Sequence, residues 1–499
     1  MQRVLEQKRL LPKDWTWATI EDIRNNVLKI KRLEVELKQS IIYLDIGGID
    51  NNRNIIDNFK VYQWESAPSR AQQIVSYKDI LFSSVRTYLK NIAMVNDISF
   101  DNQIASSGFT VIRTNKEIAL PEYVFHYVLC ERFLQPLNEL QTGSSYPAVR
   151  DSDVFTQPIP LPPKPEQRHI VAKIEQFFSK LDNAVEILKT LQQQLRVYRQ
   201  AVFTSAFEGK LTKKWRSSQN DLAISKDFKS LITKNEYSSA SSIFLTPDMI
   251  LPYDWEWVRS GDLFEFVTSG SRGWAKYYSD SGAIFLRITN LDFDSLELDL
   301  NGNIQYVNPP PSSEGTRTRV QEGDFLFSIT GYLGMFAIAP KLEEAYVNQH
   351  IALCRPLPGL NKRYLGYWII SKTGGYHYLN LLQKGATKAG LGLEDIRNFP
   401  IPLCSLAEQH EIVQEIESRL SVADKLKETI EQTLQQAEAL RQSILKKAFE
   451  GRLLSEDELA EVRKEPDWEP ARVLLERIKA QKIASDSSKK TLKKGTKKA

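Results

Sequence analysis

The chain has few cysteines and no long apolar run. Only Cys130, Cys354 and Cys404 occur among its 499 residues. Three scattered cysteines cannot form a disulfide framework, and they lack the paired spacing of a zinc site. The least charged stretch, residues 325–340, has 16 residues with Ser, Thr and two Gly among them, which is too short and too broken to span a bilayer. Residues 1–9 are polar and do not predict a signal peptide. We therefore expect a cytoplasmic protein that stays in a reducing compartment and contacts no membrane.

The chain also lacks a strong excess of charge of one sign. Lys and Arg number 66 and Asp and Glu number 62, which gives a net charge of +4. Six lysines lie between Lys489 and Lys498, and without them the remaining chain carries −2. Affinity for an anionic polymer must therefore come from the local placement of cations. The Ser- and Lys-rich residues after Lys482 are predicted to be disordered.

Sequence motifs of common catalytic and metal sites are missing. His410-Glu411 begins like a zinc-protease helix, but residue 414 is Gln instead of the second His. The chain has no G-x-x-x-x-G-K-[ST] phosphate loop, no G-x-G-x-x-G and no G-x-S-x-G nucleophile turn. Residues 308–311, Asn-Pro-Pro-Pro, have a proline where amino-methyltransferases carry an aromatic after Asn-Pro-Pro. The sequence thus predicts a chain that is not an enzyme and that binds neither a metal nor a cofactor.

What the sequence does contain is an internal repeat. Residues 158–209 recur 242 positions later, with Pro-Ile-Pro-Leu, Glu-Gln and Ala-Phe-Glu-Gly in register. Three further motifs recur at offsets of 240 to 246: Leu-Pro-x-Asp-Trp-x-Trp at 11–17 and 251–257, Asp-(Ile/Phe)-Leu-Phe-Ser at 79–83 and 324–328, and Asn-Gln at 102–103 and 348–349. The drifting offsets indicate insertions and deletions in loops. We infer two half-repeats, each a variable globular part followed by a preserved segment.

Each preserved segment has the periodicity of a long amphipathic helix. Its apolar residues recur at alternating steps of four and three, the pattern of a coiled-coil seam. The seam includes Ile174, Leu181, Leu188, Leu195 and Val202 in the first copy and Ile416, Ala423, Ile430, Ala437 and Ile444 in the second. Pro165 and a Ser405-x-x-Glu408 capping box predict the helix starts, and Gly209 and Gly451 predict their ends.

A helix of this length favours pairing between the two copies. Forty residues make a rod of roughly 60 Å, about twice the diameter of a compact domain. We therefore expect the two helices to pair antiparallel about a pseudo-two-fold axis. The alternative is that each helix packs its apolar stripe on its own domain.

The globular parts combine short strands and helices, so the expected fold class is α+β: two mixed α/β domains joined by two long antiparallel coiled-coil helices. Strands are predicted at 41–44, 79–84, 109–112 and 284–288, two more around a turn within 325–340, and helices at 121–129 and 364–371. The expected boundaries are a globular domain at 1–165, a helix at 166–209, a linker with one short helix at 210–250, a second domain at 251–405, a second helix at 406–451 and a C-terminal segment at 452–499.

Polar and aromatic loops of both globular parts are candidates for nucleic-acid contact. Arg and Lys bind phosphates, and Arg, Asn and Gln read base edges in the major groove. The candidates are Arg86, Tyr88, Lys90, Ser144, Ser145, Tyr146 and Arg150 in the first part and Ser271, Arg272, Trp274, Lys276, Arg317, Arg319, Lys384, Thr387 and Lys388 in the second. Each run alone is better explained as a solvated loop, but their recurrence at corresponding places in both halves brings the two interpretations level.

Together the duplicated motifs resemble the specificity subunits of type I restriction-modification systems. This resemblance implies that each globular part is a target-recognition domain that reads one half of a split sequence in double-stranded DNA. It implies that the helices act as a spacer and dock two methyltransferase (modification) subunits, to which nuclease-translocase (restriction) subunits add. S-adenosylmethionine then belongs to the methyltransferase, and ATP and Mg belong to the nuclease-translocase.

Two other functions stay open at this point. A self-sufficient DNA adenine methyltransferase would use residues 308–311 and needs a cofactor pocket, so cofactor binding by the isolated chain would identify it. A coiled-coil scaffold without a DNA role would leave no footprint on DNA. The target sequence and the length of its gap do not follow from the sequence.

Overall fold

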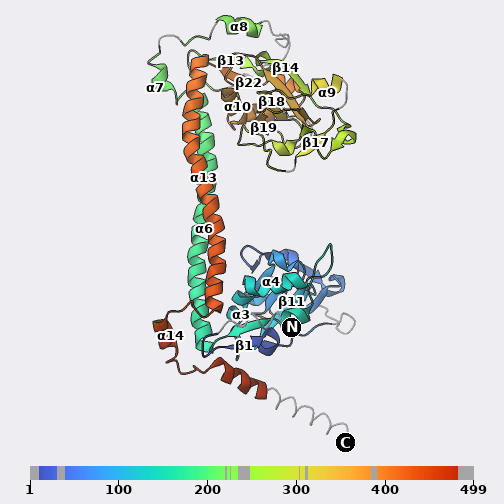
Figure 1. Cartoon of the computed structure of the whole chain (residues 1–499), viewed down its shortest axis with the longest axis vertical. Helices are drawn as coiled ribbons and strands as arrows, with labels where there is room; N and C mark the ends of the chain where they lie inside the picture. Colours follow the sequence, from blue (N-terminus) through green and yellow to red (C-terminus); the bar gives the residue numbers. More distant parts are fainter. Residues whose placement is uncertain are drawn as a thin grey trace. The chain divides into compact units, whose positions relative to one another are not determined.

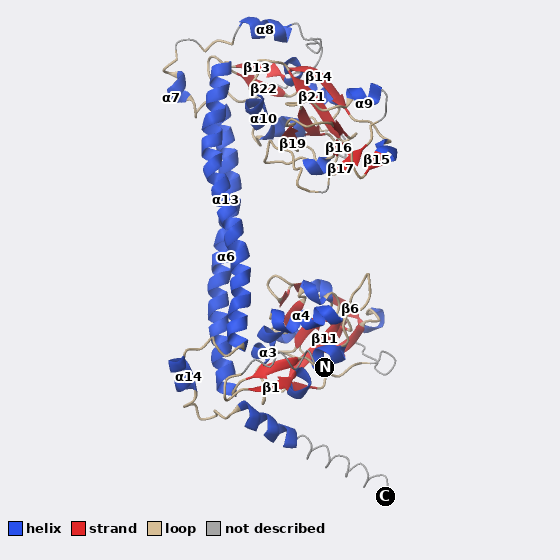
Figure 2. Cartoon of the chain, in the orientation of Figure 1, coloured by secondary structure: helices blue, strands red, loops and turns tan. Residues whose placement is uncertain are grey.

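The computed structural model describes residues 11–30, 40–219, 222–224, 226–233, 248–302, 304–309, 313–383 and 390–481 (Figures 1 and 2). The chain divides into two compact units: unit 1 contains residues 1–187 and 432–499, and unit 2 contains residues 188–431. Each unit therefore holds one globular domain together with a part of both long helices.

The two long helices are α6 (Lys164–Phe207) and α13 (Leu406–Phe449), with 44 residues each. Both end at the predicted glycines, Gly209 and Gly451, which have φ angles of 68° and 71°. The following N–H groups, of Lys210 and Arg452, donate to carbonyls five residues back at 2.9 and 2.8 Å, the pattern of a Schellman cap.

The predicted capping box at the start of α13 is only half formed. The Glu408 N–H donates to the Ser405 hydroxyl at 3.3 Å, as expected. The Glu408 carboxylate does not return to the cap, because it accepts a hydrogen bond from the Trp255 indole at 2.9 Å. A partner 153 residues away in the chain therefore replaces the local one.

The helices pack antiparallel, as predicted. In unit 1, Arg441 of α13 forms an ion pair with Asp182 of α6. In unit 2, Arg199 of α6 forms an ion pair with Asp424 of α13. The positions in α13 fall as those in α6 rise, which defines the antiparallel direction.

The expected seam residues, which are spaced seven apart in each helix, are buried or half-buried against the other long helix or against a globular domain. Burial is complete near the helix ends and at two inner positions: Ile174, Val202, Ile416, Ala423, Ile430 and Ile444. The remaining members, Leu181, Leu188, Leu195 and Ala437, are half-buried. The alternate apolar positions Leu191, Tyr198, Leu426 and Leu440 are exposed, because two helices cover only a narrow stripe of each other.

The first domain is built from small sheets and short helices. Strands β1 (Thr16–Thr19) and β12 (Pro158–Leu161) pair antiparallel, and β4 (Ile49–Asp50) pairs with β5 (Ile55–Ile56). One four-stranded sheet has the order β2 (Arg24–Asn25), β11 (Phe109–Thr114), β8 (Ile80–Ser83) and β9 (Ile92–Met94). The other has the order β6 (Lys60–Gln63), β3 (Ser40–Leu44), β10 (Ile104–Ser106) and β7 (Ala71–Ile74). The α-helices are α2 (Ile20–Ile23), α3 (Pro121–Val128), α4 (Glu131–Leu140) and α5 (Asp151–Phe155).

The second domain repeats this plan, so the duplication includes the globular parts. Strand β13 (Glu256–Arg259) pairs with β22 (Pro400–Leu403). The two larger sheets have the orders β14 (Phe264–Ser269), β21 (Ile351–Pro356), β18 (Phe325–Ser328), β19 (Phe336–Ile338), and β15 (Tyr278–Ser279), β17 (Gln305–Val307), β16 (Ala283–Leu286), β20 (Ala345–Val347). The helices are α9 (Ser313–Arg317), α10 (Lys362–Ile370), α11 (Gly375–Leu381) and α12 (Leu393–Arg397).

Three short helices lie outside the two domains: α7 (Lys213–Arg216) and α8 (Lys226–Thr233) in the expected linker, and α14 (Glu456–Val462) after α13. The predicted strands at 41–44, 79–84, 109–112 and 284–288 correspond to β3, β8, β11 and β16, and the pair within 325–340 corresponds to β18 and β19. The expected α+β class is confirmed.

Candidate nucleic-acid interface

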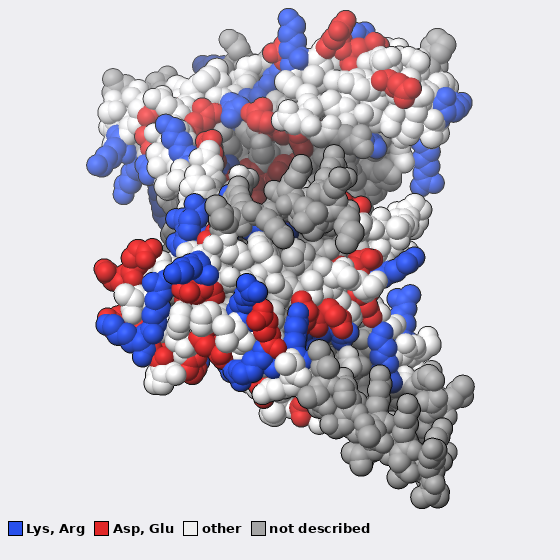
Figure 3. All heavy atoms as spheres, turned by 60° about the horizontal axis from the view of Figure 1, so that its bottom comes forward, with Lys and Arg blue, Asp and Glu red and all other residues white. Residues whose placement is uncertain are grey.

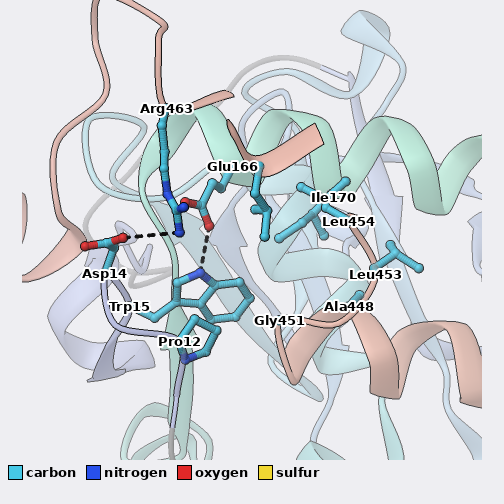
Figure 4. Close-up of a pocket in the computed structure, with 11 residues that line it drawn as sticks. Pro12, Asp14, Trp15, Glu166, Ile170, Ala448, Gly451, Leu453, Leu454 and Arg463 are labelled. Atoms are coloured by element: carbon cyan, nitrogen blue, oxygen red, sulfur yellow. Dashed lines mark hydrogen bonds and ion pairs between the residues drawn. The ribbon is translucent and has the colours of Figure 1, made fainter. Parts of the chain in front are cut away.

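The duplicated motifs build a joint between each domain and the helix ends. In unit 1 the Trp15 indole donates to the buried Glu166 carboxylate at 2.7 Å, and Arg463 lies beside Asp14 at 3.6 Å (Figure 4). Pro12 packs against the cap glycine Gly451. The pocket drawn in Figure 4 is lined by these residues. It is therefore part of the structural joint and carries no reactive group aimed at a ligand.

Unit 2 has the same joint. The Trp255 indole donates to Glu408 at 2.9 Å, and this carboxylate also accepts from the Thr212 hydroxyl at 2.8 Å and pairs with Arg216 at 2.6 Å. The Glu-Gln motif thus supplies a buried acceptor for the first Trp of the Leu-Pro-x-Asp-Trp motif. The glutamine of the motif binds the start of a neighbouring helix: Gln409 Oε1 accepts a hydrogen bond from the Asn361 N–H at 3.0 Å, at the start of α10.

The end of each long helix is held by aromatic rings of the domain in its unit. The Phe449 ring lies edge-on to Tyr123 and Tyr127, with centroids 5.2 and 4.9 Å apart. The Phe207 ring contacts Tyr364 and Trp368 at 5.5 and 5.0 Å. The recurrent motifs are thus accounted for by structure, and the candidate nucleic-acid surface must lie on the loops that differ between the halves.

In the first domain two of the predicted loops lie side by side. Residues 84–91 form the turn between β8 and β9, and residues 141–150 precede α5. A backbone bridge joins Val85 to Ala148, and the Arg86 N–H donates to the Pro147 carbonyl at 2.7 Å. Candidate residues 60 positions apart in the chain therefore share one surface.

Arg86 links the two loops through its side chain as well. Its Nη2 donates to the Ser145 carbonyl at 3.0 Å, and the guanidinium lies 5.0 Å from the centroid of the Tyr146 ring. Tyr146 is 73% exposed and Tyr88, at the tip of the turn, is 52% exposed. Ser144 and Arg150 are exposed beside them. The surface thus presents two rings, hydroxyls and a guanidinium.

The β8–β9 turn is supported from below by residues that the sequence did not single out. Asn51 Nδ2 donates to the Leu89 carbonyl at 2.8 Å, and Asn54 Nδ2 donates to the Lys90 carbonyl at 3.3 Å. The Lys90 ammonium pairs with Glu131 at 2.7 Å. The composition of residues 51–54, Asn-Asn-Arg-Asn, predicts only a polar loop, so their place under the turn was missed.

The second domain has the equivalent surface, which sequence reasoning also missed. Residues 329–335 form the turn between β18 and β19, Thr330 bridges to Gly390, and the Leu391 N–H donates to the Ile329 carbonyl at 3.0 Å. Tyr332 at the tip is 70% exposed. The turn contains no Lys or Arg, so a search for cations passes over it. The signal was the Asp-(Ile/Phe)-Leu-Phe-Ser repeat, which makes the two turns equivalent. Tyr332 lies four residues before β19, as Tyr88 lies four residues before β9.

The other predicted residues of the second domain divide between surface and core. Arg317 donates to the Ser269 carbonyl at 2.7 Å and to the Thr268 hydroxyl, which brings residue 317 next to the loop that begins at 270. The remaining side chains on this surface are exposed or half-buried: Ser271, Arg272, Lys276 and Arg319. The predicted Lys384, Thr387 and Lys388 lie outside the described residues.

Trp274 does not belong to this surface. It is only 3% exposed, and its ring stacks on Phe285 with centroids 5.1 Å apart and packs against Tyr346 at 5.3 Å. A tryptophan preceded by Arg-Gly and followed by Ala-Lys looks exposed in the sequence, but strands β16 and β20 place two aromatic rings under it. The structure therefore places the Trp274 ring in the core of the domain and not on this surface.

Positive and negative side chains are mixed on the described surface, in agreement with the small net charge of the chain. On the face drawn in Figure 3, Lys and Arg side chains are interspersed with Asp and Glu. Within the described ranges, no group of three or more His, Cys, Asp or Glu side chains is placed to hold a metal ion. The three cysteines are free and buried, and burial raises the pKa of each thiol. Among the residues that the structure describes, no helix is both long and apolar enough to cross a membrane.

Comparison with known proteins agrees with this architecture. Residues 12–196 and 252–437 each match the family described as the type I restriction modification DNA specificity domain. The chain is 29% identical to the EcoBI type I restriction enzyme specificity subunit of Escherichia coli over 375 residues, which cover 74% of each chain. It is 25% identical to the EcoKI specificity subunit of Escherichia coli strain K12, covering 77% of this chain and 76% of the relative.

A solved structure supports the same relationship. One chain of a structure that addresses complex assembly and conformational transition of the type I R-M system is similar to this chain with a TM-score of 0.68. The two are 27% identical, and the match covers 89% of this chain and 100% of the other. The chain therefore belongs to the type I restriction-modification specificity subunits, the non-catalytic DNA-specificity component of these enzymes, and it carries two target-recognition domains.

Proposed function

We propose that each domain reads one half of a split sequence in double-stranded DNA through the surface around its turn, β8–β9 in the first domain and β18–β19 in the second. The single observation that carries this proposal is the recurrence of the same turn and loop, held by equivalent backbone contacts, in both units. Both turns expose a ring four residues before their second strand, Tyr88 in the first domain and Tyr332 in the second. Rings, hydroxyls and amides at a rigid turn suit contact with base edges and phosphates.

The long helices are proposed to set the gap between the half-sites and to dock two methyltransferase subunits. Their exposed apolar positions support docking. Leu191 and Leu426 are exposed, although they are not equivalent in the repeat. Tyr198 and Leu440 are exposed and are equivalent in the repeat. Large apolar side chains exposed in rows on a helix are typical of an interface with a partner. Because the positions repeat, two copies of one partner can bind in equivalent ways.

The chemistry of modification and cleavage is assigned to partners. S-adenosylmethionine is proposed to bind the methyltransferase subunits, and ATP and Mg the nuclease-translocase subunits that join them. Among the described residues of this chain, the joint pocket of Figure 4 offers a buried carboxylate already taken by an indole, which does not suit a nucleotide. This division of labour requires the purified chain alone to transfer no methyl group, whereas the assembled complex does.

A domain exchange tests the proposal. Residues 251–405 are replaced by the matching domain of a relative with a different target, and the methylated sequence is determined across the genome of a host that carries the complex. We expect one half of the methylated sequence to change and the other half to stay. The reciprocal exchange of residues 11–161 is the matched control and should change the other half. If a single exchange altered both halves, the domains would not read DNA independently.

A further inference from the structure

The turns at the tips of the two domains share an unusual backbone. Each has two corners with positive φ: Arg86 at 50° and Lys90 at 53° in the first domain, and Gly331 at 76° and Gly334 at 85° in the second. Positive φ brings the Cβ of an L residue against its own backbone, whereas glycine adopts it without that clash. The second domain therefore has the residue that the backbone favours at both corners, and the first domain has a cation at both.

The contacts within the domain do not require a cation at either corner. The ion pair between Lys90 and Glu131 is partly exposed on both sides, and such pairs contribute little to stability. Arg86 bonds a backbone carbonyl of the neighbouring loop, but the backbone bridge between Val85 and Ala148 already joins the loops, and Thr330 and Gly390 form the same bridge without an arginine. Non-glycine residues held at positive φ cluster at functional sites, where their side chains are needed.

The tip between the corners is similar in both turns. Tyr88 and Tyr332 are exposed in the middle of each turn, although the residues on either side differ. Beside Tyr332, the polar groups that the structure describes are a hydroxyl, an imidazole and an amide: the Thr330 hydroxyl lies 2.5 Å from His350 Nδ1, and Gln349 Nε2 lies 2.9 Å from His350 Nε2. A tyrosine flanked by cations suits a groove edge lined by phosphates, and a tyrosine flanked by a hydroxyl and an amide suits base edges.

We propose that these turns enter the DNA and that the two domains use them differently. This rests on the proposed function, and it adds which residues contact DNA in each half. In the first domain, Arg86 and Lys90 bind phosphates on either side of Tyr88, and this contact depends strongly on salt. In the second domain, the Tyr332 ring contacts bases together with the Thr330 hydroxyl and the Gln349 amide. Because the ring carries no charge, its contact is nearly independent of salt.

The test uses the complex assembled with its methyltransferase subunits and a duplex that contains its methylated sequence. Arg86→Gly combined with Lys90→Gly places glycine at both corners, as in the second domain. Because glycine adopts positive φ without a steric clash, the melting temperature should not fall. Neutralising two phosphate contacts should make the negative slope of log K against log salt shallower by about 1.8. Lys13→Ala with Lys116→Ala, which removes two exposed cations of the same unit, is the matched control and should leave the slope as in the wild type.

Tyr332→Ala tests the second domain. It should weaken binding by roughly tenfold, the order expected for losing one contact with a base edge, with an unchanged salt slope. It should also reduce discrimination against base changes in one half-site only. Tyr253→Ala removes a fully exposed tyrosine away from the turn and should change neither quantity.

The outcomes separate this inference from the proposed function. If the wild-type complex did not distinguish its sequence from a duplex altered in either half, the proposed function itself would fail. If it did, but the double glycine variant kept the full salt slope, or Tyr332→Ala kept full discrimination in both half-sites, the assignment of these turns would be overturned.

Discussion

Asp182 on α6 forms an ion pair with Arg441 on α13, and the residues 242 positions away exchange roles, since Arg199 on α6 pairs with Asp424 on α13. The internal repeat therefore maps one contact onto the other. Exposed pairs of this kind are worth roughly 0–1 kcal/mol, so they mark the register of the two helices without supplying most of their stability. The stability of the pairing must come from the buried apolar positions of the seam.

The first prediction concerns that seam. Ile430 is buried and Leu188 is half-buried, both within unit 2. Ile430→Asp buries a charge without a partner and should cost several kcal/mol, measured by thermal unfolding. Leu188→Asp should cost clearly less, because water still reaches that position. Glu431→Ala, at an exposed neighbouring position, is the control; equal stability of all three variants would show that the helices do not depend on the seam.

The second prediction concerns the outer apolar face of the helices. Leu426→Asp combined with Leu440→Asp changes two exposed side chains, so the chain should fold with the wild-type melting temperature. Copurification with the methyltransferase subunits should be lost, because a charge replaces an exposed apolar side chain at two places on α13. Glu428→Gln with Glu438→Gln, polar changes on the same helix, should leave copurification intact. A double Asp variant that still carries both methyltransferases would place docking elsewhere.

The third prediction is a dependence of stability on pH that arises from one histidine. His126 is buried on α3 beside Phe125 and Phe178, and burial lowers its pKa to about 4. The charge of Glu122 raises this pKa slightly, and the charge of Arg441 lowers it slightly. In the unfolded chain its pKa is about 6.5, so between these values the unfolded state takes up a proton that the folded state does not. Stability is therefore lost as the pH falls from 6.5 towards 4, by up to about 3 kcal/mol from this group.

His126→Leu should remove that part of the acid sensitivity. Denaturant unfolding of the wild type and the variant at several pH values between 7 and 4 measures it, because the carboxyl groups common to both cancel in the comparison. His377→Leu, which changes an exposed histidine, should behave like the wild type. If His126→Leu lost stability with acid as steeply as the wild type, His126 would not be the group responsible.

The fourth prediction compares the two joints. Glu166 accepts from Trp15 at 2.7 Å and from Trp468 at a weaker 3.4 Å, whereas Glu408 has Trp255, Thr212 and Arg216. Removing one donor from a buried carboxylate costs about 1–3 kcal/mol. Trp15→Phe should therefore destabilise the chain more than Trp255→Phe. Trp257→Phe, which alters a half-buried ring of the same motif, controls for lost volume; the reverse order of the two joint variants would contradict this explanation.

The repeat made the long helices and their ends predictable, because the periodicity of the seam and the glycine caps are local signals. Long-range partners were not predictable. Glu408 was expected to complete a local capping box, but the Trp255 indole takes its carboxylate. Trp274 was expected on the surface, but a slot formed by Phe285 and Tyr346 buries it. The turn at Tyr332 was missed because its signal is an alignment between the halves and not a cluster of charge.

The spacing of the two half-sites tests the account as a whole. The register set by Asp182–Arg441 and Arg199–Asp424 places residues 188–194 of α6 opposite residues 429–435 of α13. Duplicating both segments adds one heptad to each helix and keeps the seam in phase. The insertion lengthens the pair by about 10 Å, or roughly three base pairs of DNA. Bending and twisting of the DNA can absorb part of this change.

The decisive measurement is methylome sequencing of a strain that carries this lengthened chain with its partner subunits. If the two domains read separate half-sequences and the helices set their spacing, methylation should move to sites with the same two half-sequences and a longer unread gap. Active methylation at the original gap, or at sites with altered half-sequences, would contradict the account.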